Sequence, residues 1–238
     1  MLLKKFAIHN RHNTIKMKKG VAELIGTFAL VFCGTGAIII DQQTGGAVTH
    51  VGVAITFGLI ILSMIYALGD ISGAHLNPAV SIAFLTSGRM KGKDTLNYIA
   101  WQLAGAFMAS LSLQLLFPQN HNLGVTMPAG SDIQSFILET ILTFFLMFVI
   151  MNVSTGAKEK GITAGIAVAS VVGLEAMFAG PICGASMNPA RSIAPAIVSG
   201  NMQFIAHQWI YIAGPILGAC VAVFIFNFIK NTHTTPHE

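Results

Sequence analysis

Charged residues are scarce in this chain. Lysine, arginine, aspartate and glutamate make up only 9% of its 238 residues, whereas a soluble domain has about a quarter. With 54% hydrophobic residues and a mean hydropathy of +0.71, the chain has too little polar surface to cover a globule in water. The alternating segments of a membrane β-barrel, roughly ten residues each, are also absent. We therefore predict a polytopic helical membrane protein.

Cysteine is rare as well. Cys33, Cys183 and Cys220 each lie in or beside an apolar segment and show no paired spacing. This pattern argues against a disulfide framework and against a zinc site. The sequence therefore predicts no metal centre and no cofactor.

The basic residues are concentrated at the start of the chain, which argues against a nucleic-acid partner. Six of the 13 lysines and arginines precede the first apolar run, and we interpret residues 1–19 as a solvated tail next to the membrane. Met17 is an alternative start to Met1. The six are Lys4, Lys5, Arg11, Lys16, Lys18 and Lys19.

Six segments are long enough to cross a bilayer, which takes about 20 mostly apolar residues. Two further apolar pieces, at about 77–87 and 188–198, are only half that length, and each is introduced by Asn-Pro. The six predicted spans are roughly 20–40, 51–69, 96–117, 133–153, 161–180 and 205–229.

The charges predict the orientation of these spans. With six crossings, 12 of the 13 lysines and arginines fall on one side, and Arg191 is the exception. Because positive residues favour cytoplasmic loops, we expect both termini to be cytoplasmic. The isolated position of Arg191 suggests a special role.

The two halves of the chain resemble each other. AELIGTFALVF at 22–32 matches LETILTFFLMF at 138–148, and an Asn-Pro-Ala follows the second span of each half. Each half has three spans, so the second must be inserted upside down, an arrangement that places functional sites near the bilayer midplane. We predict one membrane domain over 20–230, with repeats at about 20–117 and 133–229 and tails at 1–19 and 231–238.

Each Asn-Pro-Ala predicts a helix start, because Asn is a favoured N-cap and Pro a favoured first helical residue. The motifs are Asn77-Pro78-Ala79 and Asn188-Pro189-Ala190, and the inverted repeat points the two starts at each other in mid-membrane. The backbone before each start has to line a cavity, since it cannot face lipid. Its carbonyls should form a ladder of acceptors, from Gly73, Ala74, His75 and Leu76 and from Gly184, Ala185, Ser186 and Met187.

These motifs make the chain similar to the major intrinsic protein family, the aquaporins and glycerol facilitators. SGAHLNPAVS at 72–81 and CGASMNPARS at 183–192 carry the resemblance, which covers about residues 20–230 and is closest to the nodulin-26-like branch. It implies an all-α membrane protein with six transmembrane helices and two re-entrant half-helices in an inverted-repeat, aquaporin-like fold. It also implies a passive channel rather than an enzyme.

In such a channel the two helix starts would bring two positive dipole ends together. A water molecule between them would direct its oxygen at the amides of Asn77 and Asn188 and lose the orientation needed to relay protons. Cations would meet the same positive ends, a device already part of the general account of aquaporin-type pores. We therefore expect protons and ions to be excluded.

The resemblance assigns the constriction of the pore to four positions, here Phe57, Ala176, Ala185 and Arg191. A guanidinium donates hydrogen bonds to neutral solutes while repelling cations. Ala176 replaces the histidine of water-specific members, which favours solutes larger than water. Ser192 stands where glycerol facilitators have aspartate, which favours the opposite view. Two hypotheses stay open: a channel for water, glycerol and undissociated metalloid hydroxy acids, and a strictly water-selective aquaporin.

Buried carboxylates are expensive in a membrane and usually functional. The resemblance implies that Glu23 and Glu139 accept hydrogen bonds from the loops before the half-helices and orient their carbonyls. If they relayed protons instead, the chain would be an ion-coupled secondary transporter, with Glu175 as a third candidate. An intramembrane enzyme has no Ser/His, paired-Asp or HExxH arrangement to support it.

Two further residues have open roles. His75 is expected to line the cytoplasmic mouth or to act as a pH gate, and Cys183 is a candidate for block by thiol reagents. The resemblance also implies a homotetramer in the lipid bilayer of the cell membrane. Its partners would be water and small neutral solutes.

Overall fold

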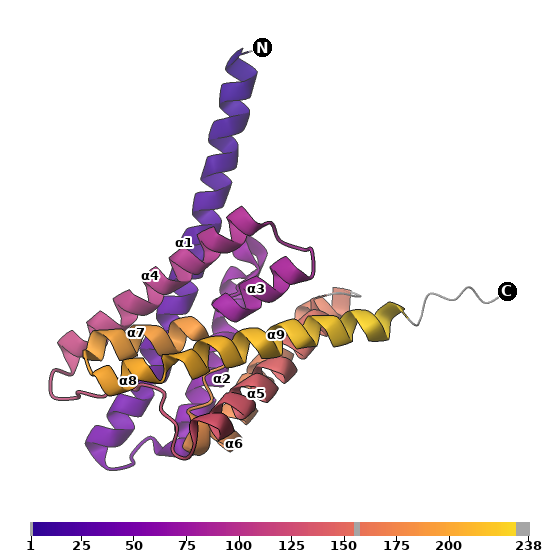
Figure 1. The fold of residues 1–238 in the computed structure, drawn as a ribbon. Coiled ribbons are helices and arrows are strands. Elements are labelled where there is room, and N and C mark those ends of the chain that lie inside the picture. The colour runs from indigo at the N-terminus through magenta and orange to yellow at the C-terminus, as the bar shows by residue number, and fades with distance from the viewer. Residues whose placement is uncertain (1, 155–157, 232–238) are drawn as a thin grey trace.

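The computed structural model describes residues 2–154 and 158–231, and the regular elements of this part are all helices. The prediction of an all-α fold with an inverted repeat is confirmed (Figure 1). The first repeat contains α1 (Leu2–Thr44), α2 (Thr49–Ser72), α3 (Pro78–Thr86) and α4 (Gly92–Leu116). The second contains α5 (Asp132–Val153), α6 (Lys158–Cys183), α7 (Pro189–Ser199), the short α8 (Met202–Ala206) and α9 (Gln208–Asn231).

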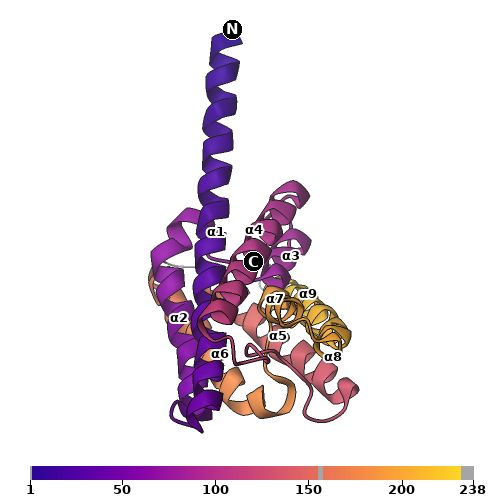
Figure 2. The ribbon, with the colours of Figure 1, turned by 90° about the vertical axis from the view of Figure 1, so that its left-hand side faces the viewer.

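Six described segments are long and apolar enough to cross a membrane, which confirms the predicted number of spans. The largest difference is at the start of the chain, where α1 runs unbroken from Leu2 and projects well beyond the bundle (Figures 1 and 2). The segment predicted as a tail therefore continues the first helix. The six are Thr14–Thr44, Thr49–Ser72, Gly92–Leu116, Asp132–Val153, Thr163–Cys183 and Met202–Lys230.

The half-helices lock the two repeats together. Within each repeat the first helix packs against the last, α1 on α4 and α5 on α9, and α2 packs against α6 across the repeats. The half-helix α3 lies against α9 of the other repeat, and α7 lies against α4. Each half-helix is thus held by a full span of the opposite repeat, which fixes where their starts meet.

Glycines allow the closest of these helix contacts. A Cβ at Gly105 of α4 would lie 2.3 Å from the Leu24 carbonyl oxygen of α1, and one at Gly218 of α9 would lie 2.1 Å from the Thr140 carbonyl oxygen of α5. A Cβ at Gly214, the repeat partner of Gly105, would lie 3.1 Å from the Glu139 Cβ, a tight but less severe contact. Small residues at such crossings let membrane helices approach closely.

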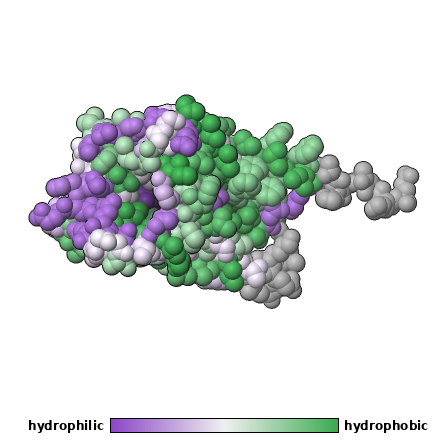
Figure 3. Space-filling view, turned by 90° about the horizontal axis from the view of Figure 1, so that it is seen from below, coloured by the Kyte–Doolittle hydropathy of each residue, from purple (hydrophilic) through white to green (hydrophobic). Residues whose placement is uncertain are grey.

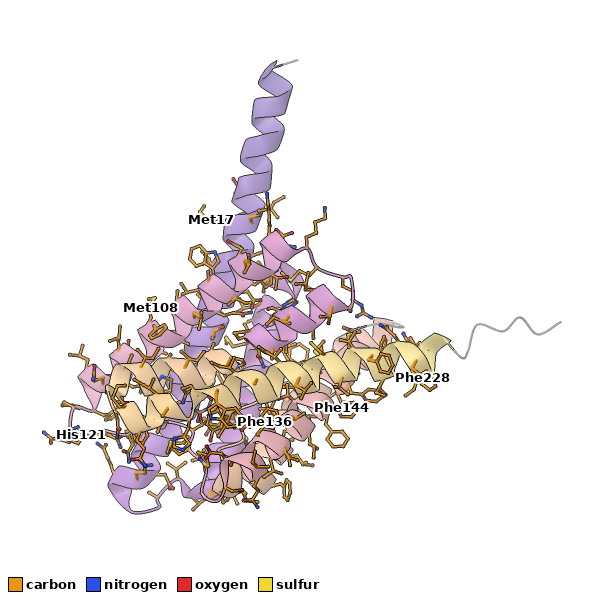
Figure 4. The ribbon with its side chains drawn as sticks, viewed as in Figure 1. Met17, Met108, His121, Phe136, Phe144 and Phe228 are labelled. Atoms are coloured by element: carbon orange, nitrogen blue, oxygen red, sulfur yellow. The ribbon has the colours of Figure 1, made fainter. Side chains whose placement is uncertain are left out.

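The outer surface of the bundle is suited to lipid. Large apolar side chains are strongly exposed on several helices, among them Leu96, Leu115 and Phe224. Met108 and Phe228 are also at least half exposed and project from α4 and α9 (Figure 4). Hydrophilic surface gathers mainly at the end of the molecule where α8 lies, and most of the remaining visible surface is hydrophobic (Figure 3).

The helix ends divide between the two ends of the bundle. The beginning of α1, the end of α9 and the α3–α4 connection lie toward the upper right in Figure 1, and the α1–α2 and α4–α5 connections lie at the opposite end. The beginning of α1 and the end of α9 therefore lie at the same end of the bundle, as an even number of crossings requires. Residues 232–238, most of the predicted C-terminal tail, lie outside the described residues.

Candidate pore and its constriction

Each Asn-Pro-Ala motif begins a half-helix. Asn77 precedes α3 in an extended conformation, and its side-chain oxygen accepts a hydrogen bond from the Ala79 N–H at 2.9 Å. Asn188 does the same for α7, accepting from Ala190 at 3.0 Å and from Arg191 at 3.3 Å. The capping oxygen fixes each amide, so its nitrogen has to point away from its own helix.

The two motifs contact each other directly. Nδ2 of Asn77 donates to the Met187 carbonyl at 2.7 Å, and Nδ2 of Asn188 donates to the Leu76 carbonyl at 2.9 Å. This reciprocal pair joins the two loops in the interior of the bundle. An amide nitrogen carries two hydrogens, so each asparagine has a second N–H beyond the one used to bridge the loops.

The backbone before each half-helix adopts the same unusual conformation twice. Ala74 and Leu76 have φ of +47° and +51°, and Ala185 and Met187 have +42° and +53°. Left-handed conformations cost non-glycine residues roughly 1–2 kcal/mol each, so surrounding contacts have to hold them. Gly73 and its repeat partner Gly184 also have positive φ.

Those contacts come from the two predicted glutamates. Glu23 accepts hydrogen bonds from the backbone N–H groups of His75 at 3.0 Å and Leu76 at 2.7 Å. Glu139 accepts from Ser186 at 2.8 Å and Met187 at 2.7 Å. Because the N–H groups turn toward the carboxylates, the opposed carbonyls turn away from them. Both carboxylates are completely buried and occupied as acceptors, which suits a structural role better than ion coupling.

The structure adds a matched pair of tyrosines that the sequence analysis missed. The Tyr98 hydroxyl of α4 donates to the Ser72 carbonyl at 2.7 Å, and the Tyr211 hydroxyl of α9 donates to the Cys183 carbonyl at 2.8 Å. Each carbonyl directly precedes the glycine that opens a loop. Aligning the two repeats would not have found this pair, because the register that pairs Gly105 with Gly214 sets Tyr98 against His207 and Tyr211 against Gln102.

Further polar residues brace each loop differently. Buried Gln102 donates to Glu23 at 2.8 Å and to Ser81 at 3.0 Å. In the second repeat, the Ser192 hydroxyl lies in hydrogen-bond contact with Ser186 and accepts from Thr126 at 2.8 Å. Gln102 and Thr126 could not be predicted as partners from the sequence, because they lie 79 residues from Glu23 and 66 residues from Ser192.

A cavity of about 150 Å³ runs past both motifs. The four residues assigned to the constriction, Phe57, Ala176, Ala185 and Arg191, all line it. The same cavity is lined by all four residues of the first predicted carbonyl ladder and by Ala185, Ser186 and Met187 of the second, and Gly184 is not among its lining residues. Aliphatic side chains from α2, α5 and α6 also line the cavity, so its lining combines polar and apolar groups.

Arg191, which the sequence analysis assigned to the constriction, is held in place by two contacts. Its Nη1 donates to the Gly124 carbonyl at 2.9 Å, and its guanidinium carbon lies 5.2 Å from the centre of the Phe57 ring. The α4–α5 connection, which carries Gly124, therefore helps to position Arg191. With one N–H bound to this carbonyl, the remaining donors of a guanidinium are available to a solute.

Three residues with open roles occupy different places. His75 lines the cavity, stacks on Phe84 with ring centres 4.5 Å apart, and has Nδ1 3.1 Å from the Ser81 hydroxyl. Cys183 is completely buried in an apolar core cluster that also contains Phe57 and Ala185. Glu175 is only 3% exposed, and its carboxylate has no hydrogen-bond partner among the described residues.

A comparison with known protein families fits this geometry. The family model described as "major intrinsic protein" matches residues 10–226. This range contains both half-helices and all four residues assigned to the constriction. The chain belongs to the major intrinsic protein family. As a member of this family it is a multi-pass membrane channel for water and small solutes, and not an enzyme.

Similar proteins also confirm the predicted branch of the family. Aquaporin NIP1-3 of Oryza sativa subsp. japonica is 48% identical over 223 residues, 93% of this chain and 77% of that protein. Nodulin-26 of Glycine max is 41% identical over 217 residues, 91% of this chain and 79% of that protein. The X-ray structure of the aquaglyceroporin from Plasmodium falciparum has a TM-score of 0.77 at 25% identity, covering 90% of this chain and 97% of that one.

Proposed function

We propose that this channel passes water, glycerol and undissociated metalloid hydroxy acids, and that it excludes protons and ions. The observation that carries the proposal is the make-up of the constriction, where Ala176 and Ala185 line the cavity together with Phe57 and Arg191. Two of the four positions have the smallest side chain that retains a Cβ. The passage can therefore accommodate a carbon backbone as well as a water molecule.

The two larger residues suit a polyol. A glycerol molecule has hydroxyl groups along one edge and C–H groups along the other. Arg191 supplies donors for the hydroxyl groups, and the Phe57 ring beside it supplies an apolar surface for the C–H edge. A neutral trihydroxy acid offers the same hydroxyl pattern, whereas a cation is repelled by the guanidinium.

Exclusion of protons would depend on the paired asparagines. The free N–H of each amide would donate to the oxygen of a passing water molecule, which then could not accept from its neighbours in the file. The amino-terminal ends of α3 and α7 add positive potential at the same place. We propose that these features interrupt proton relay while water still passes.

A strictly water-selective pore is the second candidate. It is favoured by Ser192, whose contacts with Ser186 and Thr126 draw the second loop together where glycerol facilitators have aspartate. A loop held this tightly would resist widening for a polyol.

Stopped-flow light scattering on proteoliposomes separates the two candidates. Vesicles containing the protein are exposed to gradients of sucrose, glycerol or arsenous acid and compared with empty vesicles. We expect faster shrinkage in sucrose and faster re-swelling in glycerol and arsenous acid. Water flow without glycerol flow would instead establish the water-selective pore. Solute uptake that saturates, or that follows an imposed proton gradient, would support a transporter.

We also propose that the protein works as a homotetramer in the cell membrane with both termini in the cytoplasm. The exposed apolar side chains on several helices support embedding in lipid and contacts between copies. Mass measurement of the detergent-solubilised protein, corrected for bound detergent, tests the tetramer.

A further inference from the structure

A second cavity lies beside the pore at the end of the bundle where α1 begins. It has a volume of about 500 Å³ and is lined by residues of α1, the α3–α4 connection and the first turns of α4. This volume is within the range of small-molecule sites, about 300–1,000 Å³. His75 and Phe84 line both this cavity and the pore, so the two spaces adjoin.

The cavity is strongly cationic. Asp94 is the one acidic residue among the described residues that line it, and it forms an ion pair with Lys16 at 3.0 Å. Within the described part of the chain the other lysines of the cavity form no ion pair. Their mutual repulsion would be relieved by a bound anion. The cationic residues are Lys16, Lys19, Arg89, Lys91 and Lys93.

The Arg89 guanidinium is oriented by three contacts with neighbouring side chains. Its Nη1 donates to the Ser154 hydroxyl at 3.1 Å, and its guanidinium carbon lies 5.9 Å from the Phe84 ring centre and 5.6 Å from the Phe226 ring centre. A guanidinium held in this way loses little freedom when it binds an anion, and its planar donors match phosphate oxygens.

The start of α4 adds to the positive potential. Lys91 is the N-cap of this 25-residue helix, and its side chain accepts no hydrogen bond from the backbone N–H groups of the first turn. Both Lys91 and Lys93 line the cavity, so the amino-terminal end of the helix dipole lies at its wall. Such ends favour anions, phosphate in particular.

We propose that this cavity binds a phosphomonoester and that the bound anion obstructs the adjoining mouth of the pore. A phosphomonoester carries a charge of about −1.5 to −2 at neutral pH and three acceptor oxygens, which suits several unpaired cations better than a single carboxylate does. Two sources share this chemistry: a soluble phosphorylated metabolite and the headgroup of a phosphoinositide in the adjacent leaflet. Obstruction rests on the proposed channel function, whereas binding does not.

The binding test uses the full chain in nanodiscs of phosphatidylcholine. Inositol 1,4,5-trisphosphate is titrated as the soluble probe, and phosphatidylinositol 4,5-bisphosphate incorporated into the disc is the lipid probe. The variant Lys19→Gln removes one cavity cation, and Lys18→Gln makes the same change at the neighbouring exposed residue, which does not line the cavity. We expect Lys19→Gln to weaken binding roughly five-fold, the effect of one basic residue near an anionic headgroup, and Lys18→Gln to leave it unchanged.

The outcomes separate the sources and decide the proposal. Binding of both probes with loss in Lys19→Gln alone supports a site that recognises the phosphate itself, and binding of only one probe with the same loss identifies the source. Equal losses of affinity in the two variants would mean that the probes bind a general basic surface and not the cavity, which would overturn the proposal. Absence of binding by either probe also overturns it.

Flux measurements then test obstruction. Proteoliposomes are loaded with inositol 1,4,5-trisphosphate inside, outside or on both sides, and water permeability is compared with that of unloaded vesicles. We expect a loss of permeability in the wild-type protein and in Lys18→Gln, and a smaller loss in Lys19→Gln. Normal permeability despite demonstrated binding would overturn obstruction alone. A protein that binds the probe but passes no water in any condition would instead contradict the channel function.

Discussion

At the scale of single residues, we expect Ala176, which lines the cavity, to control the width of the constriction. Replacing it with histidine adds a ring and a polar group to a cavity that Phe57 and Arg191 also line. We expect glycerol permeability to fall at least ten-fold, which corresponds to a barrier higher by about 1.4 kcal/mol. Water is smaller, so its permeability should fall less than three-fold. Stopped-flow measurements of both solutes on the same vesicles check this.

Ala176→Val is the matched control for bulk without polarity. If size alone limits glycerol, valine should reduce its passage in part and leave water flow nearly unchanged. Equal losses of water and glycerol in Ala176→His would mean that this residue does not lie at the constriction.

Glu139 and Glu175 are similarly buried but should respond differently to replacement by glutamine. In Glu139→Gln, the amide nitrogen can no longer accept from one of the backbone N–H groups of Ser186 and Met187. An unsatisfied buried donor costs about 1–3 kcal/mol, so thermal unfolding in detergent should shift to lower temperature and water permeability should drop. In Glu175→Gln, where the carboxylate has no partner among the described residues, no loss of stability is expected.

The sequence predicted the residues of the pore better than the conformation that joins them. The capping preference of Asn and Pro predicted both helix starts, and the cost of burying a charge marked both carboxylates as candidates. The loop-supporting role of the carboxylates came from the family resemblance. The left-handed φ of Ala74 and Leu76 could not, because alanine and leucine do not favour it. That conformation results from Glu23, which is distant in the sequence.

At the scale of elements, α9 and α5 can approach only because Gly218 lacks a side chain. An alanine there would place its Cβ 2.1 Å from the Thr140 carbonyl oxygen, and the helices would have to separate. We expect Gly218→Ala to destabilise the protein by about 1–3 kcal/mol, the typical cost of overpacking, as measured by thermal unfolding in detergent.

Gly69→Ala provides the comparison for this substitution. A Cβ at this helical glycine of α2 meets no atom within 4 Å, and alanine is the better helix former. Its stability should therefore stay level or rise slightly. If both variants lose the same stability, the effect is one of helix propensity or membrane insertion and not of the α5–α9 contact.

The approximate positions of the membrane-spanning helices could be predicted from hydropathy, because these helices have to be apolar where they cross the lipid. The half-helices start where Asn-Pro indicated, because capping is a local property. The continuation of α1 back to Leu2 was not predicted, since a basic segment has no apolar periodicity from which to infer a helix. The packing of each half-helix against a span of the other repeat was not predicted either. It depends on which helix faces fit together and not on any single segment.

At the scale of the whole molecule, orientation and chemistry are linked. The charged cavity and the beginning of α1 share one end of the bundle. We expect the constriction with Arg191 on the other side of the asparagine pair. If both termini are cytoplasmic, a solute arriving from outside meets the constriction first, and the cationic cavity faces the phosphorylated metabolites and lipids of the cell interior. The proposed regulation therefore depends on the orientation being correct.

Labelling of single introduced cysteines tests that orientation. His121 lies in the exposed α4–α5 connection (Figure 4), and Lys18 is exposed on α1 at the opposite end. A membrane-impermeant maleimide applied to intact cells should label His121→Cys at once and Lys18→Cys only after permeabilisation, because a charged reagent cannot cross the bilayer. The unsubstituted protein is the control for its own Cys33, Cys183 and Cys220, none of which is fully exposed. Immediate labelling of Lys18→Cys with protection of His121→Cys would mean that the protein has the opposite orientation in the membrane. The cationic cavity would then lie outside the cell.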